Sequence, residues 1–155
     1  MPQIEFRENK TLKLTNVLSK EVSAKEILNQ GKHVSMLMNW IKAKSCHTVG
    51  PVIMYSTGIK GVDGEGQPII ESRILIQLKE DNVRTDPPYR FDKELRVTDC
   101  LLARFNDDGE KLQFATNKLT LYAYENDLEL TGETYIVLME QNEKKLFADV
   151  FMPLK

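Results

Sequence analysis

The chain repeats one pattern of apolar residues and helix breakers twice along its 155 residues. Gly50 and Gly132 are the breaks, and the offset of 82 residues that superposes them also places Leu37 on Leu119. The helical spacing before each glycine and the alternating spacing after it then align without a gap. Such a repeat predicts two copies of one supersecondary unit that complete each other, because one copy alone is too small to bury an adequate core.

Each half is expected to contain one strand, one helix and two further strands, in that order. In the first half the expected ranges are 4–18, 23–44, 52–57 and 69–78. In the second half they are 95–104, 110–125, 134–140 and 146–154. Ser23 and Glu26 have the spacing of a capping box, and Gly31 predicts irregular first turns in the first helix. The predicted fold class is α+β, with duplicated βαββ units forming a mainly antiparallel sheet and two helices packed on one face.

A single domain is expected over residues 1–155, composed of pseudo-repeat halves 1–80 and 90–155. The segment 79–90 between the halves contains Asp86-Pro87-Pro88 and is the most linker-like part of the chain. The glycine-rich stretch 58–68 lacks the lysine and hydroxyl residue of a phosphate loop, so it is interpreted as a hairpin tip.

The charge pattern argues against nucleic acid as a partner. Lysines and arginines number 21 and acidic residues 23, and the basic residues are scattered among the acids. A phosphate-neutralising stripe is therefore not expected. The sequence has no apolar run of the roughly 18 residues that span a bilayer and no signal-peptide pattern at its start, so a cytoplasmic protein without membrane contact is expected. Cys46 and Cys100 are expected to be small buried hydrophobes and not a disulfide.

The sequence contains no pattern that indicates catalysis, a metal site or a cofactor. Cys46 and His47 are neighbours whose side chains do not face one another, so a thiolate–imidazole pair is not expected. His33 is interpreted as a surface or hydrogen-bonded histidine. The histidines and cysteines lack zinc-ligand spacing, and residues 106–109 are interpreted as a turn and helix cap and not as a calcium loop. We therefore expect a protein that is not an enzyme and holds no cofactor.

The last strand of each half is expected to turn one face to its helix and the other face away from it. Ile74, Ile76, Val150 and Met152 belong to the helix-facing side. The opposite side carries Glu71, Arg73, Phe147, Asp149 and Phe151, with Tyr55 and Tyr135 from adjacent strands. Aromatic residues around a few charges are typical of a small-molecule groove. Two other interpretations stay open: a solvated sheet face, or a groove filled by a pair between the repeat equivalents Arg73 and Asp149.

The order of elements and the closing segment resemble the GyrI-like family, which includes the effector-binding domains of bacterial transcription activators. The matching stretches are Trp40-Ile41, Gly50-Pro51-Val52-Ile53-Met54-Tyr55 and Asp149-Val150-Phe151-Met152-Pro153-Leu154. The resemblance implies the duplicated βαββ fold and a ligand site on the concave sheet face. The sequence departs from the family at Asp149, where glutamate is usual, and at Asp108-Gly109, which matches the Gly-centred turn only loosely. Because no helix-turn-helix segment precedes the domain, a stand-alone member is expected.

These observations predict a non-catalytic domain that binds a small amphipathic ligand in a groove between the repeats. Asp149 and Glu71 would attract a cationic ligand, and the groove aromatics would enclose its apolar part. Arg73 would weaken cation binding if it paired with Asp149. The alternative is a protein-interaction or accessory module, of the kind associated with secretion or toxins, whose groove is filled. Some GyrI-like proteins are hydrolases, but no nucleophile or base is identified in this sequence.

Overall fold

The structure is a computed structural model that describes residues 3–23, 30–142 and 144–155. It contains two compact units, which are considered separately. The first unit is Lys13–Leu95, and the second unit combines Met1–Leu12 with Arg96–Lys155. The expected fold class is confirmed: the described residues form an α+β architecture of antiparallel strands and two α-helices, consistent with the GyrI-like fold.

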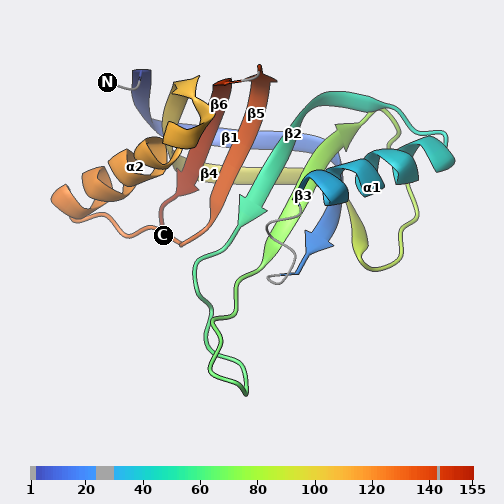
Figure 1. The fold of residues 1–155 in the computed structure, drawn as a ribbon, viewed down its shortest axis with the longest axis horizontal. Coiled ribbons are helices and arrows are strands. Elements are labelled where there is room, and N and C mark those ends of the chain that lie inside the picture. The colour runs from blue at the N-terminus through green and yellow to red at the C-terminus, as the bar shows by residue number, and fades with distance from the viewer. Residues whose placement is uncertain (1–2, 24–29, 143) are drawn as a thin grey trace. The chain divides into compact units, whose positions relative to one another are not determined.

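The first unit is built from β1 (Gln3–Val22), α1 (Gln30–Ala43), β2 (Thr48–Ser56) and β3 (Ser72–Leu78). The central strand is β3, which pairs antiparallel with the end of β1 on one side and with β2 on the other. Helix α1 lies across this sheet (Figure 1) and buries Leu37 and Ile41 against Ile74 and Ile76. These apolar positions recur at helical spacing in α1 and alternate in β3, as the sequence predicts.

The second unit repeats this plan with β4 (Tyr89–Asp108), η2 (Gly109–Lys111), α2 (Gln113–Glu125), β5 (Thr134–Gln141) and β6 (Lys145–Pro153). Here β6 is the central strand, paired antiparallel with the end of β4 and with β5. Leu119 of α2 is fully buried and packs with Val150 and Met152 of β6. The strand order first–third–second is therefore the same in both units.

Backbone conformation repeats at the predicted offset. Gly50 and Gly132 both have left-handed φ values, 88° and 93°, which glycine adopts without steric cost. The residues that follow the helices, Ser45 and Asp127, also match, with φ values of 55° and 54°. The duplication inferred from a few apolar residues thus extends to main-chain geometry.

The two 20-residue strands each contribute to both units. The start of β1 belongs to the second unit, where the ring of Phe6 lies 4.3 Å from that of Tyr122 on α2. The start of β4 belongs to the first unit, where Tyr89 stacks on Trp40 of α1 at 4.9 Å. Each helix is therefore flanked by an aromatic residue from the beginning of the other repeat's first strand.

Several element boundaries differ from the expected ones. β4 begins at Tyr89, inside the predicted linker, because Tyr89 and Phe91 alternate and pack on the core of the first unit. β4 also continues to Asp108, through most of the predicted turn at 106–109. The expected helix cap is present there, because the Asp108 carboxylate accepts the backbone N–H of Glu110 at 3.0 Å. In the first half, α1 begins at Gln30, and Glu26 of the predicted capping box lies outside the described residues.

Both cysteines are free thiols in different environments. Cys100 on β4 is fully buried, and burial raises the pKa of its thiol to about 11. Cys46 is half-buried after α1, and burial also raises the pKa of its thiol. Within the described ranges, no helix is long and apolar enough to cross a membrane.

We expect thiol labelling at pH 8 to separate the two cysteines. Cys46 should react in the native protein, whereas Cys100 should react only after unfolding in urea, because reaction requires an accessible thiolate. Since the native pKa of Cys100 lies above its unfolded value, its contribution to stability is complete below pH 9 and declines as the pH rises towards 11. Labelling of wild type, Cys46→Ser and Cys100→Ala with a chromogenic disulfide gives the measurement. Equal rates at both thiols would contradict the burial of Cys100.

Candidate functional site

The sheet of the second unit has one face turned away from α2, and this face carries four of the predicted site residues. Val150 and Met152 of β6 face α2, so the alternating residues Phe147, Asp149 and Phe151 lie on the opposite face. The strand register places Tyr135 of β5 directly beside Phe151. We call this surface, made of Arg104, Tyr135, Phe147, Asp149 and Phe151, the aromatic face.

Most of the aromatic face is covered. Tyr135, Asp149 and Phe151 are each less than a tenth exposed, and Phe147 is half-buried. A buried carboxylate requires a charged or hydrogen-bonding partner, because its desolvation is otherwise costly. Asp149 therefore needs a partner that compensates its charge.

Arg104 of β4 neutralises Asp149 through a two-pronged ion pair. The residues are direct neighbours across β4 and β6. Arg104 Nε donates to Asp149 Oδ1 at 2.9 Å, and a terminal guanidinium nitrogen donates to Oδ2 at 3.1 Å. Hydrogen bonding to Asp149 raises the pKa of the Arg104 guanidinium. The Arg104 side chain is 46% exposed and the Asp149 side chain only 10%.

The same guanidinium lies over an aromatic ring. Its central carbon is 5.7 Å from the ring centroid of Phe147, within the range of a cation–π contact. The planar guanidinium of Arg104 thus contacts both a carboxylate and an aromatic ring. Sequence reasoning missed Arg104, although its alternation with the core residues Ala103 and Phe105 was a usable signal.

The other three predicted residues belong to the first unit. Arg73 of β3 is buried and directs two hydrogen bonds, at 3.0 and 2.9 Å, to the hydroxyl of Ser19 on β1. Burial is the main factor that lowers the pKa of Arg73. Tyr55 of β2 is half-buried beside Arg73 in the register. Glu71 precedes β3, and its carboxylate accepts a 2.9 Å hydrogen bond from Lys60, which lowers the pKa of Glu71.

The residues considered for catalysis, Cys46, His47 and His33, each contact a different partner. His47 pairs with Glu80 at 3.0 Å, while the thiol of Cys46 is directed to the carbonyl of Lys44 at 3.7 Å. His33 is buried on α1 and is hydrogen-bonded to Lys20 at 2.7 Å. In the described part of the chain, no group of three or more histidine, cysteine or acidic side chains could hold a metal ion.

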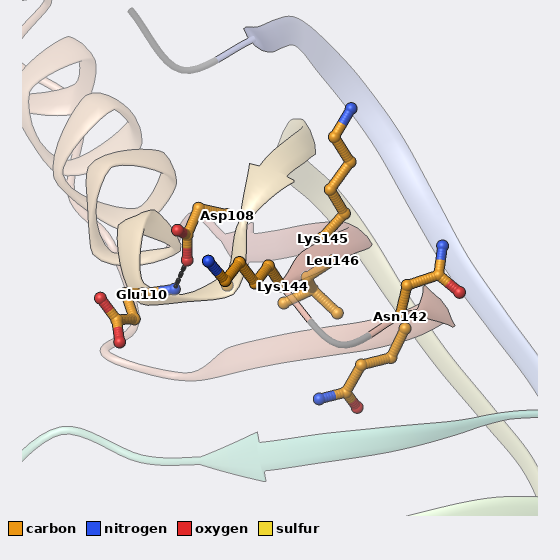
Figure 2. Close-up of a pocket in the computed structure, with 8 residues that line it drawn as sticks. Asp108, Glu110, Asn142, Lys144, Lys145 and Leu146 are labelled. Carbon is orange, nitrogen blue, oxygen red and sulfur yellow. Dashed lines mark hydrogen bonds between the residues drawn. The ribbon is translucent and has the colours of Figure 1, made fainter.

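A polar pocket of about 380 Å³ opens where η2 meets the β5–β6 turn (Figure 2). Its described lining residues are Asp108, Gly109, Glu110, Gln141, Asn142, Lys144, Lys145 and Leu146. None of the seven predicted site residues is among them. Because this lining carries both acids and lysines and no aromatic ring, it does not offer the walls that an amphipathic cation requires.

Comparison with known proteins supports the fold. No protein-family model matches the sequence, and no curated protein is similar to it in sequence. The structure resembles EcmrR in a complex with DNA, with 12% identity and a TM-score of 0.65 over 99% of this chain. The match spans 57% of the EcmrR chain, so this protein corresponds to little more than half of it.

Two further solved structures match this chain over nearly their whole length. SAV2435 bound to tetraphenylphosphonium has 8% identity and a TM-score of 0.53, covering 99% of this chain and 94% of that one. A hydrolase encoded by lin2189 from Listeria innocua has 9% identity and a TM-score of 0.54, covering 99% and 92%. At these identities the likeness shows a shared fold.

Proposed function

We propose that this protein is a non-catalytic, GyrI-like binding domain that holds a small amphipathic cation on the aromatic face. The observation that carries this function is the pairing of the buried Asp149 carboxylate with the planar guanidinium of Arg104, which lies over the ring of Phe147. A carboxylate in a partly desolvated, aromatic setting attracts a cation more strongly than one in water. Phe151 and Tyr135 supply apolar area beside it.

The chemistry of one fold neighbour is in keeping with this function, since SAV2435 was solved bound to tetraphenylphosphonium, a lipophilic cation. A non-catalytic role is supported by Cys46, whose pKa is raised and whose thiol is directed to a backbone carbonyl. We expect Glu71 to contribute less than Asp149, because the Glu71 side chain is 32% exposed and water screens its charge more strongly than that of Asp149, which is 10% exposed.

Calorimetric titration with tetraphenylphosphonium chloride tests the function. Wild type should bind it saturably, and Asp149→Asn should raise Kd at least about tenfold, because a desolvated charge contact is removed. Glu125→Gln removes an exposed acid from α2 and is the matched control for net charge, with an expected change in Kd below about twofold. Sodium tetraphenylborate, of the same shape and opposite charge, should bind at least tenfold more weakly.

A different result would favour the alternative, a protein-interaction module. Helix α2 exposes Phe114, Leu121 and Tyr124, with Tyr124 82% exposed, which is unusual apolar surface for one short helix. Wild-type binding that is unchanged in Asp149→Asn would exclude the cation site as proposed.

A further inference from the structure

Arg104 already contacts the two groups that would bind the ligand in the proposed function, the Asp149 carboxylate and the Phe147 ring. Both oxygens of Asp149 accept from its guanidinium, and the ring of Phe147 lies under the same group. On the premise that the aromatic face binds cations as proposed above, we propose that Arg104 is a built-in competing cation. It holds the site closed in the free protein, and a ligand must displace it from Asp149.

The exposures of the paired side chains fit this arrangement. Arg104 reaches solvent over nearly half of its side chain, whereas Asp149 is almost fully covered. Because the guanidinium contacts both carboxylate oxygens, truncating it uncovers the acid. An arginine at this exposure can also move its charge into water when a ligand arrives, since a displaced guanidinium remains hydrated there.

The first unit shows that this arrangement is particular to the second. The strand neighbour of Arg73 on β1 is Glu21, so the acid and the base have exchanged strands relative to Arg104 and Asp149. Arg73 is buried and bonded to Ser19 within its own unit. A base that is buried on the central strand offers no carboxylate for a ligand cation to capture. A displaceable cation over a central-strand acid is therefore expected in the second unit.

When a tethered group competes for a site, the apparent affinity of the ligand is the intrinsic affinity multiplied by the fraction of time that the site is open. If the Arg104–Asp149 pair is closed for roughly nine-tenths of the time, removal of Arg104 should lower Kd about tenfold. Ligands with delocalised charge and aromatic surface should be favoured, because they replace both the ion pair and the ring contact. Small hydrated cations should not displace the arginine.

The test is calorimetry with tetraphenylphosphonium chloride on wild type, Arg104→Met, Arg104→Lys and Arg104→Met/Asp149→Asn. Methionine keeps an apolar stem without the charge, and lysine keeps the charge without the two-pronged geometry. We expect Kd to fall about tenfold in Arg104→Met and by a smaller factor in Arg104→Lys. In the double variant, Kd should not fall below the wild-type value. Arg96→Met, which removes an exposed arginine from the same strand, is the control for net charge and should leave Kd within about twofold of wild type.

The outcomes separate this inference from the function on which it rests. Tighter binding in Arg104→Met that disappears in the double variant supports both. Binding that depends on Asp149 but is not strengthened by either Arg104 variant overturns the competitor role and leaves the cation site standing. The competitor role is also overturned if the double variant still binds more tightly than wild type, or if Arg96→Met tightens binding as much as Arg104→Met does. If no variant binds, the cation site itself fails. Arg104→Lys keeps the test decisive if Arg104→Met does not fold.

Discussion

Leu37→Ala and Leu119→Ala should each lower the free energy of unfolding by about 3–5 kcal/mol, the range for leucine truncation in a core that collapses poorly. Both side chains are completely buried, each between the helix and the sheet of its own unit. A loss of about 3 kcal/mol in a chain of this size corresponds to a fall in Tm of roughly 6–12 °C. Urea denaturation followed by circular dichroism measures the free energy of unfolding of each variant, and a thermal scan with the same signal measures Tm.

Exposed neighbours on the same helices provide the controls for these two variants. Met36 and Leu121 are 41% and 57% exposed, so Met36→Ala and Leu121→Ala should change the free energy of unfolding by no more than about 0.5 kcal/mol. The repeat equivalence predicts that both core variants are costly. A costly Leu119→Ala beside a neutral Leu37→Ala would show that the two positions are not equivalent core sites.

The repeat was predictable from the sequence because its signals are local. Helical spacing before Gly50 and Gly132 and alternation after them depend only on neighbouring residues, and the structure places Leu37 and Leu119 at equivalent sites. The start of β4 was not predicted, because Asp86-Pro87-Pro88 is a strong turn signal. The alternation of Tyr89 and Phe91 that follows is informative only once the core that receives it is known.

The partner of Asp149 could not be predicted for a different reason. Alternation shows which face a residue occupies, but the residue beside it on that face depends on which strands pair and in what register. The sequence therefore indicated a carboxylate among aromatics and suggested its repeat equivalent, Arg73, as the counter-ion. The structure supplies a partner from β4, Arg104, which lies directly opposite in the strand register.

Substitutions at two adjacent residues of β6, Val150 and Asp149, should differ strongly in their effect on stability, because the two side chains lie on opposite faces of the sheet. Val150 is completely buried against α2, so Val150→Asp places a charge in an apolar core and should prevent stable folding. Asp149→Val instead removes one member of an ion pair whose other member is 46% exposed. Arg104 can then turn to water, so the free energy of unfolding should change by about 1 kcal/mol or less.

Val150→Thr makes the first result measurable if Val150→Asp does not fold. Threonine has nearly the shape of valine, and its buried hydroxyl without a partner should lower the free energy of unfolding by about 1–3 kcal/mol. Urea denaturation of wild type, Val150→Thr and Asp149→Val gives the comparison, with soluble yield as the measurement for Val150→Asp. If Asp149→Val is as destabilising as Val150→Thr, the carboxylate is a structural element of the core. Such a result would leave no charge on this face for a ligand to capture without unfolding the sheet, and it would count against the cation site independently of any binding experiment.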